Sequence, residues 1–290
     1  MTTTSLLESP ARLRDWVGRS ETRADFVTTA PLVALAATLD RDEPEPLPGS
    51  DVPPLAHWLY FQPHARQSVI GDDGHPQRGG FLPPVALPRR MWAGGRLEFH
   101  HPLQTGDEVT RESSIVSVDA KEGRSGRLVF VTVRHVIANA RGVAITEEQD
   151  IVYREAPAAG ATPQAPQPAS AIASFERTVV PDPVLLFRYS ALTFNSHRIH
   201  YDRDYATRVE GYPGLVVHGP LIATLLVDLL RSEMPDVRLR RFAFTAVRPL
   251  FETAPFSVCG QETDAADVAL WARDADGCLA MRAEARVDRP

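Results

Sequence analysis

The chain carries, within one short region, the stretches Tyr189-Ser-Ala-Leu-Thr-Phe-Asn195-Ser-His197-Arg198-Ile-His200-Tyr-Asp202 and Gly214-Leu-Val-Val-His218-Gly219-Pro220. The first stretch combines amide, imidazole, guanidinium and carboxylate groups, a composition typical of a catalytic or polar-ligand loop. The second stretch leads directly into an apolar segment, residues 221–230, whose apolar residues recur at helical spacing. We therefore expect a buried helix here, with an active site between the loop and the start of that helix.

The helix start suggests a place for negative charge. Pro220 suits a first helical turn, and the amides of that turn have no partner within the helix. Gly219 allows a ligand to come close to the backbone, so it is the candidate oxyanion-binding residue. The simpler alternative is that Gly219 only makes a turn before a core helix.

His200 is the leading candidate for a general base, because an ordinary imidazole exchanges protons near neutral pH. Asn195 can orient water or a carbonyl through its amide. Asp202 can either fix the imidazole tautomer or cap the following turn, and both roles stay open. His197 stands three residues before His200, but the neighbouring sequence offers no third ligand, so we predict that no metal is bound.

These residues, together with Met91-Trp92-Ala-Gly-Gly-Arg96 and Pro102-Leu-Gln-Thr-Gly-Asp107, resemble the MaoC-like, type-2 acyl-thioester dehydratases and hydratases. The resemblance covers most of the chain. It is strongest with the two-hotdog subgroup that contains the mesaconyl-CoA (3-methylfumaryl-CoA) hydratases and the 3-hydroxyacyl-thioester dehydratases. It implies an α+β fold, a double hotdog in which two helix-plus-antiparallel-sheet halves form a pseudo-dimer within one chain.

One departure from the family pattern concerns the second proton-transfer group. The family motif has an aspartate five residues before the histidine, and this chain has Asn195 there, or Thr193 if two residues are inserted. An amide cannot accept a proton as a carboxylate can. His200 must then carry more of the proton transfer, with Asp202 or a residue from the other half of the chain as its partner.

An alanine- and proline-rich segment, residues 156–172, predicts a linker between a first domain, residues 1–155, and a second domain, residues 173–290. The halves repeat one plan, because residues 130–137 and 143–153 predict a strand pair around a glycine turn, and residues 268–273 and 278–287 predict another. We expect one central helix in each half, at residues 31–39 and 221–230. Only the second half carries the catalytic loop, so the first should wall the acyl pocket.

Composition sets the broad class. The chain has 290 residues, 43% of them hydrophobic, and a formal net charge of −6. These values are ordinary for a soluble protein and argue against nucleic acid as a partner. Neither a membrane span nor an export signal is recognisable, so we expect a cytoplasmic protein. Dinucleotide-binding and P-loop glycine patterns are also missing from the sequence, and we expect no cofactor beyond coenzyme A as part of the substrate.

Substrate recognition is expected to involve cations. Residues 71–84 are rich in glycine and proline and predict a long loop, which leads to the paired Arg89 and Arg90. Forked guanidinium groups suit a carboxylate or a phosphate of coenzyme A, although a solvated basic surface is an equal alternative. The candidate substrate-binding residues are Arg198, His197, His218, Arg89, Arg90 and Trp92.

The expected activity is reversible addition of water to an enoyl-CoA, of which a short branched dicarboxylic one such as mesaconyl-CoA or itaconyl-CoA is the first choice. The alternatives are a 3-hydroxyacyl-thioester dehydratase of fatty-acid synthesis, a hotdog thioesterase and a non-catalytic acyl-CoA-binding protein. Coenzyme A and an acyl-carrier protein both remain possible carriers. A homo-oligomer would be ordinary for such a protein.

Overall fold

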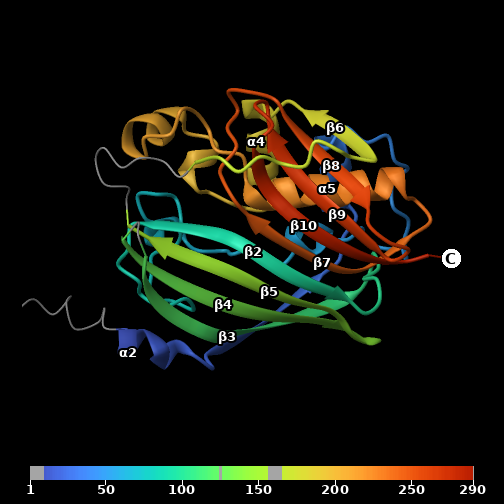
Figure 1. The fold of residues 1–290 in the computed structure, drawn as a ribbon. Helices are drawn as coiled ribbons and strands as arrows, with labels where there is room; N and C mark the ends of the chain where they lie inside the picture. The colour runs from blue at the N-terminus through green and yellow to red at the C-terminus, as the bar shows by residue number, and fades with distance from the viewer. Residues whose placement is uncertain (1–9, 124–125, 156–164, 290) are drawn as a thin grey trace, which may run out of the picture.

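A computed structural model describes residues 10–123, 126–155 and 165–289 of the chain. Its strands form one antiparallel sheet of ten strands in the order β1-β3-β4-β5-β2-β7-β10-β9-β8-β6 (Figure 1). The first half supplies β1 (Ser20–Phe26), β2 (Arg89–Phe99), β3 (Glu108–Gly123), β4 (Gly126–Asn139) and β5 (Gly142–Arg154). The second half supplies β6 (Phe175–Val179), β7 (Arg238–Ala246), β8 (Phe256–Glu262), β9 (Asp267–Asp274) and β10 (Leu279–Asp288).

The two halves follow the same plan. In each, one strand and a helix precede a strand at the seam, and three further strands form a meander that ends beside that seam strand. The seam strands β2 and β7 pair with each other, from Gly94 opposite Thr245 to Glu98 opposite Arg241. This symmetry agrees with the predicted duplication and confirms the α+β double-hotdog fold.

The longest helix, α5 (Gly219–Glu233), is the one predicted from the apolar segment. Pro220 occupies its first turn, and every residue from Leu221 to Leu230 is buried. One side of α5 packs against β8, β9, β10 and β6, and Figure 1 shows it lying across the curved sheet of the second half. In the first half, α3 (Ala30–Thr38) confirms the second predicted helix.

The remaining helical elements are short. They are α2 (Pro10–Leu13), η1 (Arg14–Trp16), η2 (Ala56–Leu59), η3 (Gln67–Val69), α4 (Pro183–Leu192), η4 (Arg198–His200) and η5 (Tyr205–Val209). The Asp182 carboxylate caps α4 by accepting hydrogen bonds from the amides of Val184 and Leu185. The polar stretch that begins at Tyr189 therefore starts inside a helix and becomes a loop only after Leu192.

The segment predicted as a linker is not separate from the two halves along its whole length. Residues 156–164 lie outside the described residues, whereas residues 165–172 run beside the second half. There Pro168 bridges to Cys278, and the Leu279 amide donates to the Gln167 carbonyl. One apolar core also draws residues from both halves, among them Leu97 and Phe242. The division at residues 156–172 therefore stays a prediction. Within the described part of the chain, no helix has the length and hydropathy needed to cross a bilayer.

Candidate active site

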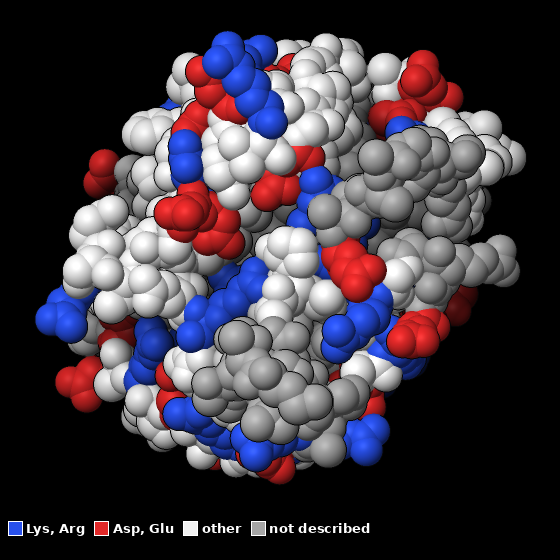
Figure 2. Space-filling model, turned by 90° about the vertical axis from the view of Figure 1, so that its left-hand side faces the viewer, with Lys and Arg blue, Asp and Glu red and all other residues white. Residues whose placement is uncertain are grey.

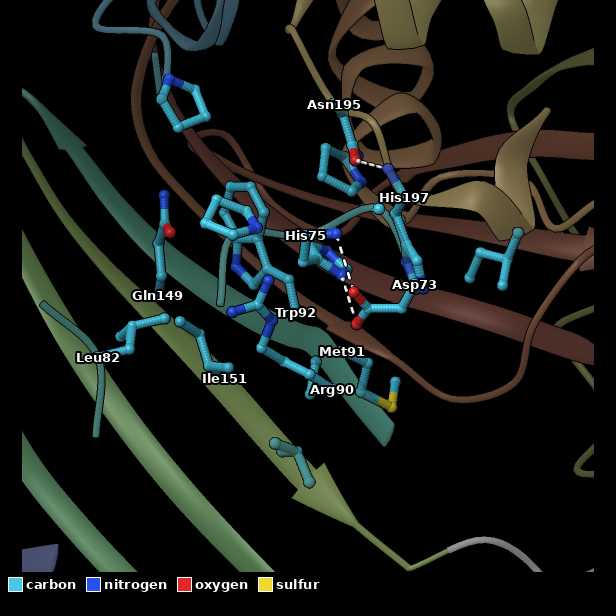
Figure 3. Close-up of a pocket in the computed structure, with 18 of the residues that line it drawn as sticks. Asp73, His75, Leu82, Arg90, Met91, Trp92, Gln149, Ile151, Asn195 and His197 are labelled. Carbon is cyan, nitrogen blue, oxygen red and sulfur yellow. Dashed lines mark hydrogen bonds and ion pairs between the residues drawn. The ribbon is translucent and has the colours of Figure 1, made fainter. Parts of the chain in front are cut away.

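A cavity of about 1130 Å³ lies where the two halves meet, and both halves line it. The second half contributes Asn195, His197, His200 and Gly219 from the two stretches that the sequence singled out. The first half contributes the seam strand β2 and the loop before it. Figure 3 shows residues of both halves facing one another across this cavity. The sequence-based expectation of an active site between the polar loop and α5 thus corresponds to a real cavity.

His200 is held as a neutral base. Its Nδ1 lies 2.7 Å from the carbonyl oxygen of Val216. Because a carbonyl can only accept, Nδ1 carries the hydrogen and Nε2 keeps its lone pair. Burial lowers the pKa of His200 to about 4, more than the bond to Val216 raises it. The imidazole is therefore unprotonated at neutral pH and can take a proton from water.

His218 supports His200 from behind. Its ring stacks on that of His200 with centroids 3.7 Å apart, and its Nε2 shares a hydrogen bond of 2.8 Å with Ser190 Oγ. His218 is 1% exposed and does not line the cavity. This imidazole is enclosed between His200 and the core, so the predicted substrate-binding role of His218 stays a prediction.

Gly219 opens α5 at the cavity wall. Its amide has no acceptor among the described residues, as expected for the first residue of a helix. A Cβ placed on Gly219 would meet only the Trp92 carbonyl oxygen, at an ordinary contact distance of 3.7 Å. The space beside the Gly219 backbone is thus open, and the positive end of the helix dipole favours negative charge at the start of α5.

Asn195 shapes the loop as well as lining the cavity. Its Oδ1 accepts a hydrogen bond of 3.0 Å from the backbone amide of His197, drawn as a dashed line in Figure 3. The amide nitrogen, Nδ2, has no acceptor among the described residues and can donate to a ligand or to water. The ring of His197 lies edge-on to that of His200, with centroids 5.5 Å apart.

The first half brings an unexpected pair to this site, Asp73 and His75. In Figure 3 both lie beside His197, with Arg90 and Trp92 close by. The Asp73 carboxylate accepts from Nδ1 of His75 at 3.2 Å and from the His75 amide at 2.9 Å. The centroids of the His75 and His197 rings are 4.1 Å apart. Asp73 and His75 from the first half and His197 from the second half thus share one wall of the cavity.

The electrostatics keep this wall anionic at Asp73 and neutral at the histidines. Burial lowers the pKa of His197 to about 2, and burial also lowers the pKa of His75 despite its bond to Asp73. For Asp73, burial acts to raise the pKa, but the hydrogen bonds from His75 and the neighbouring imidazoles outweigh it, so the pKa lies well below its usual range. A proton entering the site would therefore be stabilised best next to Asp73.

The loop that carries Asp73 is fastened to the catalytic loop. The Arg198 amide donates to the Asp73 carbonyl at 3.0 Å, and Ser196 Oγ donates to the Gly74 carbonyl. Gly74 has φ +87°, and a Cβ there would lie 1.9 Å from the Ser196 carbonyl oxygen. Only glycine permits this approach, so the sequence at Gly74 fixes how the two loops meet.

Two predicted site residues lie outside the cavity lining. Arg198 pairs with Asp202 at 2.8 Å and donates to the Asp72 carbonyl, so it ties the loops together on their outer side. Asp202 also accepts from the Tyr205 amide at 3.0 Å, which is the capping alternative. The tautomer of His200 is fixed by Val216 instead. The structure thus places Arg198 and Asp202 outside the cavity lining, and a substrate-binding role for Arg198 and a catalytic role for Asp202 stay predictions.

Arg89, Arg90 and Trp92 line the cavity from β2. Arg89 is occupied by Glu210, with Nε 3.1 Å from its carboxylate, and lies over the ring of Tyr212. Arg90 forms no ion pair with a carboxylate among the described residues, and its charge acts to lower the pKa values of His75 and His197. Trp92 donates from Nε1 to the Gly94 carbonyl and presents its ring surface.

The mouth of the site is basic. Figure 2 shows Lys and Arg side chains gathering across the middle of one face, at the height where the two halves meet. Several arginines line the cavity, namely Arg23, Arg78, Arg89, Arg90, Arg111, Arg154 and Arg248. Such a surface suits the phosphate groups of an anionic carrier.

A metal could also be considered at this wall. Asp73, His75 and His197 bring one ligand atom each within 4.8 Å of one another. The sequence missed this grouping, because the third ligand comes from the other half of the chain. The carboxylate and Nδ1 of His75 already satisfy each other by hydrogen bonding. The geometry thus fits a hydrogen-bonded group of acids and bases better than a set of ligands held apart for an ion.

Of the residues predicted from the sequence, the cavity is lined by His200, His197, Asn195, Gly219, Arg89, Arg90 and Trp92, whereas Asp73 and His75 were not among the predictions. It had identified residues 71–84 as a long loop with a possible function. An Asp-x-His spacing inside a breaker-rich loop was the available signal. Nothing in the sequence showed that this loop docks against residues 195–200.

The family relationship rests on two comparisons. Residues 55–252 match the family model described as hydroxyacyl-thioester dehydratase type 2. Over 274 residues the chain is 51% identical to mesaconyl-C(4)-CoA hydratase from Chloroflexus aurantiacus, covering 92% of this chain and 95% of that protein. It is 31% identical over 271 residues to the mitochondrial hydroxyacyl-thioester dehydratase type 2 of Schizosaccharomyces pombe, covering 82% of this chain and 89% of that one.

Solved structures support the fold. HtdX of Mycobacterium tuberculosis superposes with a TM-score of 0.64 at 21% identity, covering 92% of this chain and 99% of that one. A MaoC-like dehydratase from Phytophthora capsici gives a TM-score of 0.66 at 12% identity, covering 97% and 99%. With the matched family model and relatives, the conclusion is that the chain belongs to the hydroxyacyl-thioester dehydratase type 2 family and is an enzyme of the hydro-lyase class.

Proposed function

We propose that this enzyme adds water reversibly across the double bond of a short, branched, dicarboxylic enoyl-CoA, with mesaconyl-CoA linked through its C4 carboxyl as the preferred substrate. The coarser activity, hydration and dehydration of acyl thioesters, follows from family membership. The finer assignment is supported by the charge of the cavity and by the 51% identity to a mesaconyl-C(4)-CoA hydratase.

The proposed mechanism begins at the thioester carbonyl. Its oxygen accepts a hydrogen bond from the Gly219 amide, which draws electron density from the double bond and makes the β-carbon electrophilic. Nε2 of His200 takes a proton from water as the water oxygen bonds to the β-carbon. The amide nitrogen of Asn195 holds the water or the carbonyl in line. This reaction needs no cofactor beyond the thioester carrier.

The observation that carries the substrate assignment is the position of Arg90. It is a cation on the cavity wall with no carboxylate partner among the described residues, and it lies near His75 and His197. Placing a cation in a partly desolvated site is costly unless an anion compensates it. In mesaconyl-C4-CoA the free carboxylate is attached to the β-carbon, so it would lie beside the reacting atoms, where Arg90 can pair with it.

The test replaces Arg90 with glutamine and compares mesaconyl-CoA with crotonyl-CoA, which has no free carboxylate. A hydrogen bond to a charged group is worth about 1.5–3 kcal/mol, or roughly 10- to 100-fold in kcat/KM. We expect that loss with mesaconyl-CoA and less than about a threefold change with crotonyl-CoA. Arg134→Gln is the matched control, because Arg134 pairs with Glu148 on an exposed strand surface outside the cavity.

Equal losses of kcat/KM with both substrates would show that Arg90 does not bind the free carboxylate of the substrate. Itaconyl-CoA belongs in the same series, because it carries a second carboxylate in a different position. A wild-type enzyme that prefers long-chain 3-hydroxyacyl thioesters would instead assign it to fatty-acid synthesis. Release of free thiol would identify a thioesterase, and binding without turnover would identify a binding protein.

A further inference from the structure

We propose that Asp73 and His75, from the first half of the chain, form the second proton-transfer pair of the active site and replace the motif aspartate that is missing at Asn195. This inference rests on the proposed hydration reaction. His75 is the catalytic member, because it would exchange a proton with the substrate α-carbon. Asp73 is the positioning member, because it acts through His75.

The pair has the geometry of an acid–base dyad. The Asp73 carboxylate accepts from Nδ1 of His75 at 3.2 Å, which leaves Nε2 of His75 with its lone pair. Nε2 has no partner among the described residues, and His75 lines the cavity. A carboxylate on Nδ1 fixes the tautomer of an imidazole and stabilises the cation that forms when Nε2 gains a proton.

Elimination among the cavity carboxylates also selects Asp73. Within the described part of the chain, three acidic side chains line the cavity. Glu21 is paired with Arg23 at 3.1 Å, and Glu210 is paired with Arg89 at 3.1 Å. Only Asp73 among them is hydrogen-bonded to a histidine. Asp202, the sequence-based candidate, lies outside the cavity.

Hydrogen bonds between two loops hold the Asp73–His75 pair in the site. The backbone bonds from Arg198 and Ser196 fasten the Asp73 loop to the loop that carries His197 and His200. A positioned group needs such support to hold a productive geometry. The charged and titratable groups that face His75 are Asp73, His197, His200, Arg90 and Arg78. Asp73 is the anion among them, so it is the group that can stabilise a protonated His75.

His197 connects the two halves of the site. Its ring contacts that of His75, with centroids 4.1 Å apart, and that of His200, with centroids 5.5 Å apart. His197 thus lies between His200 and His75, and in the proposed mechanism it transfers the proton from one to the other. Mutual repulsion among three closely spaced imidazoles favours only one protonated ring at a time.

The proposed step balances in atoms and electrons. One O–H bond of water breaks, its proton goes to Nε2 of His200, and the oxygen bonds to the β-carbon. The electron pair of the double bond moves toward the thioester oxygen and forms an enolate held by the Gly219 amide. The proton passes through His197 to His75, and Nε2 of His75 then delivers it to the α-carbon as the enolate collapses. All three imidazoles are neutral before and after, and dehydration reverses each step.

The experiment measures Asp73→Asn and His75→Gln in the full-length enzyme with mesaconyl-CoA. General acid–base groups contribute roughly 10²- to 10⁴-fold, so we expect kcat to fall by at least about 100-fold while KM changes by less than about threefold. Asp72→Asn is the matched control, because the neighbouring Asp72 side chain is exposed and lies outside the cavity. Thermal melting establishes that each variant is folded. Asp73→Asn is nearly isosteric, so it serves as the test if His75→Gln does not fold.

A second readout separates proton transfer from structural support. We expect the deuterium isotope effect on dehydration of the α-deuterated 3-hydroxyacyl-CoA to be larger in Asp73→Asn than in the wild type, because removal of the α-proton becomes slower than every other step. A purely structural role would lower kcat without raising the isotope effect. That result, or kcat within about threefold of the wild type in both variants, would overturn the proposal.

Two further outcomes are distinguishable. If the wild type hydrates no enoyl-CoA, the proposed function fails and so does the basis of this inference. If the wild type hydrates mesaconyl-CoA and Asp73→Asn does so equally well, only the inference fails. Stoichiometric Zn²⁺ in the purified enzyme, with activity lost on chelation and restored by Zn²⁺, would make Asp73, His75 and His197 a metal site and would also overturn the proposal.

Discussion

The imidazole of His200 is expected to act as a base over an unusually wide range of pH. Its ordinary pKa is about 6.5, and burial lowers it to about 4. Because the neutral form is the active one, a lowered pKa extends activity toward acid pH. We predict that kcat/KM for hydration stays level from about pH 8 down to about pH 5 and falls below that.

The measurement is a pH profile of kcat/KM, taken with short exposures to acid so that unfolding does not contribute. An acid limb that is half complete near pH 6.5 would show that His200 titrates normally and would contradict its buried, neutral state. The stability of the folded protein is expected to fall with decreasing pH as well. The unfolded chain binds more protons than the folded one between about pH 4 and pH 6.5, so the stability contributed by neutral His200 is lost as pH falls through that window.

Gly219 offers a second residue-scale prediction. A methyl group there meets no protein atom closer than 3.7 Å, so Gly219→Ala should fold with a melting temperature within about 3 °C of the wild type, since helix interiors tolerate alanine well. The methyl group would narrow the open space beside the amide that, in the proposed mechanism, binds the thioester oxygen. We expect kcat to fall by about 10²-fold or more, as for loss of an oxyanion donor. An unchanged kcat would show that the thioester carbonyl does not bind at the Gly219 amide.

Candidate roles could be predicted for residues whose partners lie close to them in the sequence. His200, Asn195 and Gly219 lie close together in the chain, and their residue types suggested their roles. The place of Asp73 and His75 in the site could not be found in this way, because the contact of His75 with His197 depends on the docking of two loops from different halves. The predicted substrate-binding role of Arg198 is not tested, and in the structure Arg198 pairs with Asp202, four residues further along the chain.

At the scale of elements, the loop carrying Asp73 and the catalytic loop should behave as one unit. Gly74→Ala would force a Cβ to within 1.9 Å of the Ser196 carbonyl oxygen and would strain a residue with φ +87°. We predict a loss of more than about 2 kcal/mol in the free energy of unfolding, beyond the 1–2 kcal/mol typical of the strain alone. Hydratase activity should fall with it, because His75 would move away from His197.

Gly142→Ala is the control for backbone strain. Gly142 has φ +107° in the turn between β4 and β5, and a Cβ there meets nothing within 4 Å. It should lose stability from strain while keeping its catalytic rate per folded molecule. Equal effects of the two substitutions on stability and on rate would contradict a specific role for the docked loops. Denaturant unfolding and initial rates provide both quantities.

Most elements followed from sequence pattern. The hairpin strands β4, β5, β9 and β10 alternate in hydrophobicity around glycine turns, and α5 is apolar at helical spacing, so local physics determined them. The helix α4 was missed because its last turn, which includes Tyr189 and Leu192, was interpreted as part of the polar loop. Its start nevertheless carries a recognisable signal, an aspartate cap followed by proline at residues 182 and 183.

For the whole molecule, the two halves should unfold together. The seam strands β2 and β7 pair from Gly94 to Glu98 of β2, and one apolar core contains residues from both halves. We predict a single thermal transition in calorimetry, with equal calorimetric and van't Hoff enthalpies. Two separate transitions would show that the halves are independent domains and that the seam contributes little.

The global arrangement was accessible from family resemblance and not from periodicity. Hydrophobic patterns predicted helices and antiparallel strands in each half but could not predict which strands meet at the seam. The pairing of β2 with β7 joins residues about 150 positions apart in the chain. That pairing brings Arg90 and Trp92 to the catalytic loop, so the composition of the site depends on a contact that local sequence does not encode.

The most direct test of the proposed function is a single assay of the purified wild-type enzyme. It follows the enoyl-thioester absorbance with mesaconyl-CoA, itaconyl-CoA and crotonyl-CoA while a thiol reagent reports hydrolysis. We predict loss of the enoyl band without thiol release, fastest with mesaconyl-CoA linked through C4. Thiol release, or turnover of crotonyl-CoA as fast as that of the dicarboxylic substrates, would contradict the proposed function.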